Sequence, residues 1–318
     1  MSESSITSTS KNTEMTFDPE EFKIVGIDES ESEKIYRPSI TYWQDVWRRF
    51  KANKVALFAA ILFISIAVLT IIGPSLSGYD YRYMDKNAIL LPPCKEHWFG
   101  TDRMGRDTFT RVCVGGRISI VIGVVCTFFM AVIGSIYGGI AGYCGGKVDF
   151  IMMRIAEILS SMPYLIVVIL LSLIMGRSMF SLVVAMTAFS WIGTSRLVRG
   201  QVLQLKESEY VLSAKALGAS SREVIFKHML PNSFGILMVD ITLSVPGFIF
   251  SEAFLSYIGL GVKPPQTSWG ALASEAQEEL MFYPYLLFFP CLFISLVMLS
   301  FNLLGDGLND AMDPQLRQ

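Results

Sequence analysis

EYVLSAKALGASSREVIFKHMLPN, residues 209–232, is a polar segment that lies between the fourth and fifth hydrophobic stretches of the chain. A chain that only crosses a bilayer can join two spans by a short turn. A long, basic, helix-forming segment on one face of the membrane therefore indicates contact with something outside the membrane. The hydrophobic stretches on both sides of it make the chain an integral membrane protein.

The composition supports a membrane class and excludes several others. The chain has 318 residues, of which 52% are hydrophobic and only 17% are charged, whereas a soluble domain is usually nearer a quarter charged. The net charge of −2 gives no sign of nucleic-acid binding. Only two histidines, His97 and His228, are present, so few residues are available for metal binding or acid–base catalysis.

Six apolar segments predict an all-α integral membrane fold with six transmembrane helices. Each approaches or exceeds the ~20 residues that a helix needs to cross the hydrocarbon, and backbone groups in lipid must be satisfied within the span. The segments are 55–73, 118–142, 158–175, 179–198, 232–256 and 284–304. Gly176-Arg177-Ser178 predicts a tight hairpin, and Pro163 a kink or a site that neighbouring helices accommodate. Arg154 and Glu157 are expected to pair on an amphipathic lead-in, 147–157.

The remaining segments complete the expected organisation. Residues 1–39 predict a flexible cytoplasmic tail, and residues 40–54 an interfacial amphipathic helix with Trp43, Trp47 and Phe50 on one face. Residues 74–117 form an extracytoplasmic loop, 199–231 a cytoplasmic loop, and 305–318 a cytoplasmic C-terminal tail. Because Lys and Arg are more numerous in the segments that share a side with the N-terminus, both termini are expected in the cytoplasm.

The 209–232 segment predicts two short helices that meet at a glycine. Glu209 to Leu217 favours a helix, and Gly218 can close its last turn with a positive φ. Ser220 and Glu223 form a capping box that starts a second helix, which is expected to end before Pro231. These helices would expose an apolar ridge, which indicates either a protein contact or a hairpin that lies on the bilayer. The ridge comprises Tyr210, Ala214, Leu217, Val224 and Ile225.

This segment resembles the cytoplasmic coupling loop of bacterial ABC-importer permeases. Leu212-Ser213-Ala214 stands at that loop's Glu-Ala-Ala, Gly218 at its glycine, His228 at its isoleucine and Leu230-Pro231 at its end. The Glu, the first Ala and the Ile are absent, and these departures are similar to the peptide-transport branch. Further segments resemble peptide and nickel permeases in the same order along the chain: 42–50, 97–107, 255–262, 264–270, 302–308 and 313–314.

The resemblance implies a type I ABC-importer permease core of five helices, 118–304, with one helix added at the N-terminal side, in a bacterial cell membrane. It implies an importer of peptides, with oligopeptides favoured, or alternatively of nickel or another small solute. The implied partners are a second homologous permease, two cytoplasmic ATPases that bind ATP and Mg, an extracytoplasmic substrate-binding protein and membrane lipid. This chain would hold no cofactor and no catalytic residue. The implied ATPase-coupling residues are Tyr210, Ala214, Leu217, Gly218, Ser220, Glu223, Leu230 and Pro231.

Two acidic residues of the fifth apolar segment have different expected roles. Asp240 either lines the translocation path, where it would meet a peptide's amino group, or accepts hydrogen bonds from Ser244 or a neighbouring helix. Glu252, near the outer end, is expected to be interfacial and solvated. An ion-coupled secondary transporter remains a rival, but it predicts inverted repeats and broken helices with several central charges. A membrane enzyme would need a catalytic cluster that the sequence lacks.

Smaller patterns complete the expectations. His97, Asp102 and Asp107 superficially suggest a metal site, although Gly100 and Gly105 fit a tightly turned loop better. Cys94 and Cys113 share one loop and could pair if it faces an oxidising space. Four glycines at or near helical spacing predict a close helix-packing surface. They are Gly134, Gly138, Gly139 and Gly142.

Overall fold

The computed structural model describes residues 42–312, which are predominantly helical with an isolated β-bridge between Thr101 and Asp107. The predicted tail 1–39 lies outside the described residues. The helical elements are α1 (Tyr42–Ala52), α2 (Lys54–Ser77), α3 (Thr108–Cys144), α4 (Gly146–Ser160), α5 (Tyr164–Met175), α6 (Met179–Leu205), α7 (Glu209–Ala216), α8 (Ser221–Glu223), the π-helix η2 (Val224–Met229), α9 (Leu230–Asn232), α10 (Phe234–Tyr257), α11 (Trp269–Gln277) and α12 (Tyr285–Met312).

Within residues 42–312, five helices are long and apolar enough to cross a membrane: α2, α3, α6, α10 and α12. The sixth expected span is divided, because α4 and α5 bend by 79° at a short break. The break falls at Ser161–Pro163, and Pro163 lies at the N-cap of α5. Of the two alternatives for Pro163, a kink or accommodation by neighbouring helices, the structure shows the kink, and the third predicted span is two helices, not one. A proline cannot continue the hydrogen bonding of the preceding helix.

The second apolar helix begins earlier than expected. α3 starts at Thr108, where the side chain of Asp107 accepts a hydrogen bond from the Thr110 amide at 2.8 Å. The loop before α3 therefore shrinks from the expected 74–117 to residues 78–107, and Arg117 lies inside α3. Its guanidinium donates hydrogen bonds to the carbonyls of Thr70 and Ile71 in α2. Because these carbonyls accept hydrogen bonds from the guanidinium, the cost of placing a basic residue in a long membrane helix is reduced.

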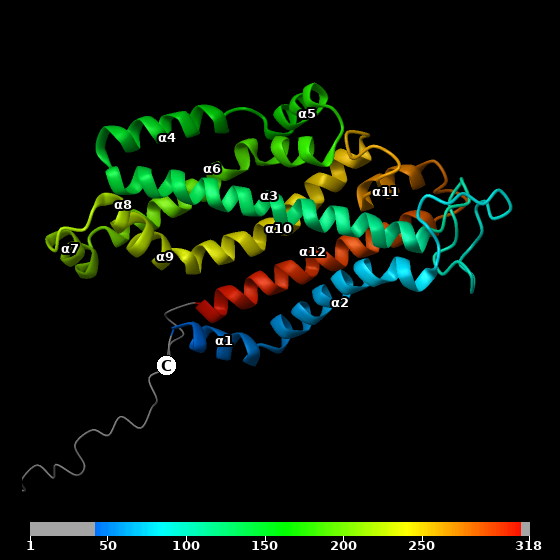
Figure 1. The fold of residues 1–318 in the computed structure, drawn as a ribbon, viewed down its shortest axis with the longest axis horizontal. Coiled ribbons are helices and arrows are strands. Elements are labelled where there is room, and N and C mark those ends of the chain that lie inside the picture. The colour runs from blue at the N-terminus through cyan, green and yellow to red at the C-terminus, as the bar shows by residue number, and fades with distance from the viewer. Residues whose placement is uncertain (1–41, 313–318) are drawn as a thin grey trace, which may run out of the picture. The chain divides into compact units, whose positions relative to one another are not determined.

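The helices gather around α3, which runs the length of the bundle beside α6 (Figure 1). One buried cluster joins α3, α6 and α10 through Ile122, Met186 and Phe248, among others. A second joins α2, α3, α10, α11 and α12 and includes the fully buried Trp269. In Figure 1, α7 and α8 lie at one end of the bundle, whereas α11 and the 78–107 loop lie at the other.

Three of the four predicted glycines, Gly134, Gly138 and Gly142, lie where α3 and α6 meet, whereas Gly139 faces Leu230 of α9. A Cβ at Gly138 would overlap the carbonyl of Ser195, and one at Gly134 would come within 2.7 Å of the Thr194 side chain. A Cβ at Gly142 would lie 3.0 Å from the Arg199 carbonyl. The helix backbones therefore approach each other more closely than any residue with a side chain would allow.

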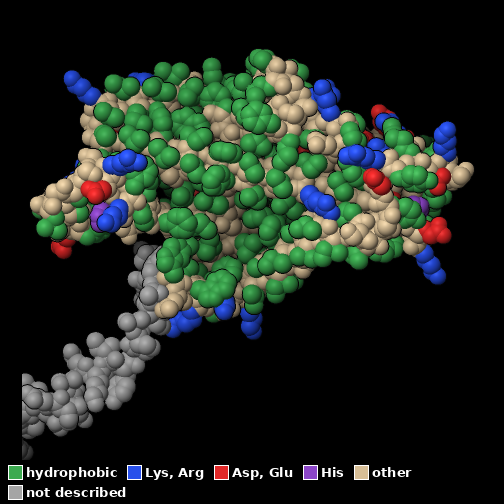
Figure 2. Space-filling view, in the orientation of Figure 1, with side chains coloured by type: hydrophobic (Ala, Val, Ile, Leu, Met, Phe, Trp, Pro, Cys, Tyr) green, Lys and Arg blue, Asp and Glu red, His purple; other side chains and the backbone are tan. Residues whose placement is uncertain are grey.

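The outer surface of the bundle fits a lipid environment. Figure 2 shows hydrophobic side chains over the middle of one face and charged side chains gathered towards its two ends. Large apolar residues of α2, such as Phe58, Ile64 and Ile71, are between 57% and 63% exposed. A soluble domain would not leave such a continuous apolar surface uncovered, so the described region is an integral membrane protein.

Substitution of Gly138 by alanine tests the α3–α6 contact. We expect Gly138→Ala to lower the free energy of unfolding by about 1–3 kcal/mol, because the new methyl group meets backbone that cannot move aside. Thermal unfolding in detergent would measure the loss. Gly193→Ala in α6 is the matched control, since a Cβ there has no atom of this chain within 4 Å. Equal melting temperatures for the two variants would contradict the assignment.

Candidate functional site

The 209–232 segment folds as two short helical pieces joined at Gly218. α7 ends at Ala216, and Gly218 has a φ of +86°, which lets the chain turn sharply. The Ser220 side chain accepts a hydrogen bond from the Glu223 amide, while Glu223 accepts one from the Ser220 amide at 2.9 Å. The hydrogen bonds that the Glu223 carboxylate accepts from the Ser220 amide and hydroxyl hold the pKa of Glu223 below its usual range. The predicted turn and capping box are both confirmed.

The helix after the capping box does not end before Pro231, so that expectation was wrong. α8 passes into the π-helix η2 and then into α9, with Pro231 at the start of α9. In the wider turn the Leu230 amide donates to the Ile225 carbonyl, five residues back. A π-helical turn accommodates an extra residue. In the first turn of a helical segment the backbone N–H groups have no acceptor within that segment, so the missing N–H of a proline there breaks no hydrogen bond. The chain therefore stays helical almost continuously from Ser221 into α10.

The apolar residues of this segment divide into an exposed and a buried group. Leu217 is 89% exposed and Tyr210 is 41% exposed, as a contact surface requires, whereas Ala214 is half-buried. Val224 and Ile225, which were expected to share this ridge, are instead buried. They turn inward because Val224 packs into a buried cluster with Val198 and Met229, while Ile225 lies against Gly139 of α3. Leu212 and Phe226 take their place at the surface, with 52% and 49% exposure.

Tyr143, at the end of α3, fastens the segment to the bundle. Its hydroxyl donates a hydrogen bond to Ser221 at 3.2 Å, and its ring lies 5.0 Å from the ammonium group of Lys215. Its carbonyl accepts a hydrogen bond from Lys206 at 2.8 Å. Beneath it, Val198, Val202, Val211, Val224 and Met229 form a small buried cluster. Sequence analysis missed Tyr143, because nothing in its local sequence signals a contact 78 residues away.

Asp240 lies in α10 and is half-buried. Its carboxylate accepts a hydrogen bond of 2.7 Å from the Thr194 hydroxyl of α6, so of the two structural alternatives the neighbouring helix supplies the donor. Ser244, Gly247 and Ser251 follow it at helical spacing, and a Cβ at Gly247 would meet nothing within 4 Å. This face of α10 is thus polar and open at membrane depth, although Leu243 and Phe250 flank it.

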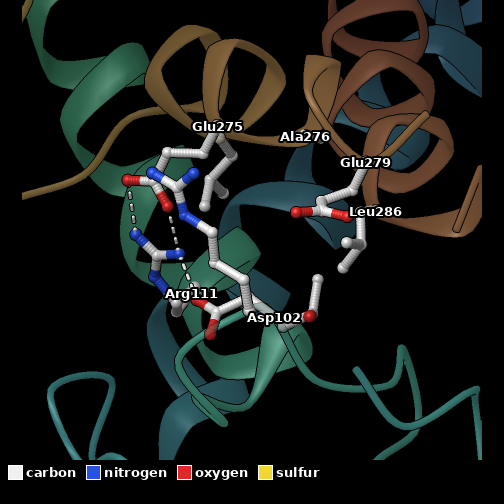
Figure 3. Close-up of a pocket in the computed structure, with 9 residues that line it drawn as sticks. Asp102, Arg111, Glu275, Ala276, Glu279 and Leu286 are labelled. Carbon is white, nitrogen blue, oxygen red and sulfur yellow. Dashed lines mark hydrogen bonds and ion pairs between the residues drawn. The ribbon is translucent and has the colours of Figure 1, made fainter. Parts of the chain in front are cut away.

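At the opposite end of the bundle, an ion-pair cluster joins the 78–107 loop to α11 (Figure 3). Asp102 accepts from Arg106 at 2.7 Å and from Arg111 at 2.6 Å. Glu275 of α11 accepts two hydrogen bonds from Arg111, at 2.7 and 3.0 Å, and one from Arg106 at 2.9 Å. Arg103 pairs with Glu278. We call Asp102, Arg106, Arg111 and Glu275 the outer clamp.

The cavity beside the outer clamp is too small for a transported solute. Its volume is about 20 Å³, which is room for one water molecule. The hydroxyl of Thr108, which lines it, is buried without a protein partner, and a single water would satisfy it. Burial alone would raise the pKa of Glu275, but the hydrogen bond from Arg111 and the charges of Arg111 and Arg106 outweigh it and lower that pKa below its ordinary value.

Glu252 is fully buried, so the expectation of a solvated, interfacial glutamate was wrong. Its carboxylate accepts hydrogen bonds from Ser119 of α3 at 2.7 Å and from Ser256 at 2.6 Å. Ser119 in turn accepts from the Trp269 amide, and Ser268, the N-cap of α11, donates to Ser256. The hydroxyls of Ser119 and Ser256 donate to the carboxylate, and Ser268 connects this network to the N-terminus of α11.

The remaining outer residues have structural roles. His97 lies 2.9 Å from Asp107, and within residues 42–312 no group of three or more His, Cys, Asp or Glu could hold a metal ion. Gly100 and Gly105 have positive φ, as expected for a tightly turned loop. Cys94 and Cys113 are both free, so the disulfide considered from the sequence does not form: Cys113 is buried in α3, whereas Cys94 is exposed.

Comparison with known families extends this description. Residues 132–318 match the family model described as the binding-protein-dependent transport system inner membrane component. Residues 41–93 match the N-terminal transmembrane domain of oligopeptide transport permease C. The first match covers α4 to α12 with the last third of α3, and the second covers α1 and α2.

Named relatives align over nearly the whole chain. The oligopeptide transport system permease protein OppC of Bacillus subtilis is 47% identical over 297 residues, which are 93% of this chain and 97% of the relative. The dipeptide permease DppC of the same organism is 46% identical over 94% of each chain. OppC of Escherichia coli K12 is 41% identical over 91% of this chain and 96% of its own length.

The lowered pKa of Glu275 predicts an acid-labile outer clamp. Because the folded pKa lies below the unfolded value, the clamp's contribution to stability is complete above the ordinary glutamate pKa of about 4.3 and is lost as the pH falls through the lower, folded pKa. Hydrogen exchange of α11 should therefore accelerate below about pH 4. Glu275→Gln should exchange fast at every pH, whereas Glu157→Gln, in an exposed pair, should resemble wild type. If the hydrogen-exchange protection of wild-type α11 fell at the same pH as that of all the other helices, the clamp would not be a local feature.

Proposed function

Since the chain belongs to the family of binding-protein-dependent transport system inner membrane components, we propose that it is one of two permease subunits of an ATP-driven peptide importer. Its spans would form half of the translocation path in a bacterial cell membrane, with both termini in the cytoplasm. Two cytoplasmic ATPases would bind ATP and Mg, and an extracytoplasmic binding protein would deliver the substrate. A secondary transporter does not fit this family membership.

The 209–232 segment is the surface on which we place the ATPase contact. Leu217, Tyr210, Leu212 and Phe226 are exposed, and they lie on a folded element rather than on a loose loop. An apolar surface on a preorganised support is what a protein partner recognises. Ser220 and Glu223 hold the start of the second helix, while Leu230 and Pro231 connect it to α10. This exposed, helix-supported apolar surface is the observation that carries the proposal.

The open polar face of α10, together with Asp240 and Thr194, is our candidate for the translocation path. Polar groups at membrane depth face protein or water rather than lipid. Gly193 of α6 and Gly247 of α10 leave open space beside them, so the path can form where this face meets a second permease. A carboxylate on the wall would attract the protonated amino group of a peptide.

The substrate class follows from the relatives. The named relatives with 41–47% identity carry oligopeptide or dipeptide in their names, so peptides are favoured over nickel. We therefore assign oligopeptides or dipeptides as the solute. No cofactor is assigned to this chain, because ATP chemistry is expected on the partner subunits.

Crosslinking tests the assembly directly. The chain would be co-expressed with its expected partner permease and ATPases, and Leu217→Cys would be treated with a short thiol-to-amine crosslinker. We expect adducts with an ATPase subunit and a weaker yield from Glu157→Cys, an exposed position on α4 outside the segment. Recovery of the purified chain without any ATPase, or equal crosslinking from both positions, would refute the proposal.

A β-branched residue at Gly218 should uncouple transport. Valine at a φ of +86° costs about 1–3 kcal/mol, so the turn would rearrange. We expect Gly218→Val to assemble normally but to lose roughly tenfold in peptide uptake per ATP hydrolysed, equivalent to about 1.4 kcal/mol. Gly218→Asn is the matched control, because asparagine tolerates positive φ and should retain most of the uptake. Normal coupling in the valine variant would remove the turn from the mechanism.

Neutralising Asp240 should change which peptides are transported. We expect Asp240→Asn to weaken uptake of peptides with a free amino terminus by about 1 kcal/mol, or roughly fivefold, relative to N-acetylated peptides. Thr194→Val removes the hydrogen bond to Asp240 but keeps the charge. If both variants lower the uptake of all peptides equally, Asp240 serves packing and not the path.

A further inference from the structure

A cavity of about 590 Å³ opens beside the 209–232 segment, between α1, α3, α6 and the start of α10. Its walls are mainly apolar and include Trp43, Phe226, Leu230, Phe234 and Leu237. The rings of Trp43 and Phe234 meet edge to face, with centroids 5.8 Å apart. This volume lies within the range of small-molecule sites, and it is far larger than the outer cavity.

Two serines line this otherwise apolar cavity, and one of them, Ser233, donates to the Met229 carbonyl at 2.9 Å. The other, Ser135 of α3, is only 8% exposed, and its hydroxyl has no hydrogen-bond partner in the protein. A buried hydroxyl without a partner is unfavourable. Many serines in this bundle bond to a carbonyl of their own helix, as Ser195 and Ser300 do. The free hydroxyl of Ser135 therefore indicates an occupant that accepts a hydrogen bond.

The position of α1 gives the depth of the cavity in the membrane. α1 exposes Trp43 and Trp47, and the Trp47 ring stacks on Phe50 with centroids 5.9 Å apart. Tryptophans on a short amphipathic helix mark the boundary between headgroups and acyl chains. Because Trp43 forms part of the wall, the cavity lies at this boundary, where one end is bathed by headgroups and the other by hydrocarbon.

The helix that supplies Trp43 of the wall, α1, is basic. Residues 42–54 contain one acidic residue, Asp45, against four basic ones. Asp45 pairs with Arg48 and Arg49 at 2.8 and 2.9 Å, which leaves a net positive charge on α1. Lys227 follows Phe226 of the wall in sequence. Basic side chains next to a membrane-surface helix are attracted to anionic lipid headgroups.

We propose that this cavity binds one acyl chain of an anionic phospholipid, whose ester carbonyl accepts the hydrogen bond from Ser135. Water would satisfy Ser135 but would leave the surrounding aromatic and aliphatic walls wetted. A protein side chain would fill the cavity without using the positive charge of α1. The phospholipid alone matches the apolar volume, the unpartnered donor and the positive charge of α1 together.

Such a site would link lipid to the proposed coupling. Phe226 belongs to η2, and Leu230 and Pro231 belong to α9, so the bound chain contacts the helical connection between the 209–232 segment and α10. The lipid site itself does not depend on the proposed function. Failure of the ATPase crosslinking experiment would therefore leave the lipid experiment unaffected.

Photolabelling of the full chain in nanodiscs tests the site, whether or not other subunits are bound. The nanodiscs would contain phosphatidylglycerol with a diazirine on the acyl chain, or phosphatidylcholine with the same chain. We expect adducts in the peptide that contains residues 226–237, with several-fold more from phosphatidylglycerol. Leu237→Trp, which fills the cavity, should lower labelling there roughly tenfold, equivalent to about 1.4 kcal/mol. Leu243→Trp, at a 44% exposed position of the same helix, is the matched control.

A second variant keeps the test decisive if Leu237→Trp fails to fold. Ser135→Ala preserves the shape of the wall and removes only the donor, so it should lower labelling by about two- to tenfold. Unchanged labelling in both variants, or equal labelling by the two lipids, would overturn the proposal. It would also be overturned if a photoreactive residue at position 237 crosslinked the second permease rather than lipid.

Discussion

The close approach of α3 and α6 is the contact on which the rest of the structure depends. Gly134, Gly138 and Gly142 remove side chains from the interface, so the α3 backbone lies directly against α6. Both ends of α3 then serve as attachment points: Arg111 joins the outer clamp, and Tyr143 holds the 209–232 segment. In lipid, where apolar burial does not drive helices together, such packing must supply the association.

The two ends of this bundle are held very differently. At the end that holds α11, the hydrogen bonds of the fully buried Glu252 and the paired charges of the outer clamp fix both ends of this helix, and breaking such a buried pair is strongly unfavourable. At the other end, the exposed capping box of Ser220 and Glu223 and the turn at Gly218 hold a small helical hairpin. Exposed contacts contribute little stability, so this end is the one that a partner can move.

Local signals made part of this arrangement predictable. The turn at Gly218, the capping box and the glycine surface depend on residues close together in sequence, and all three are confirmed. Burial depends on distant residues. Glu252 could be recognised as buried only by knowing that Ser119, more than a hundred residues away, lies against it. Val224 and Ile225 were misplaced because their burial depends on Val198 of α6 and Gly139 of α3, which no local pattern reveals.

The π-helix also bears on how motion could travel. A proline at position 231 would ordinarily end a helix, which would separate the 209–232 segment mechanically from α10. Instead η2 absorbs the extra residue, and the chain remains helical into α10 apart from a turn at Ser233. Asp240 lies nine residues beyond Pro231, about 14 Å along a helix. A rotation of the proposed coupling surface would therefore be transmitted to the Asp240–Thr194 pair through a nearly continuous helix. A flexible loop in its place would absorb the same displacement.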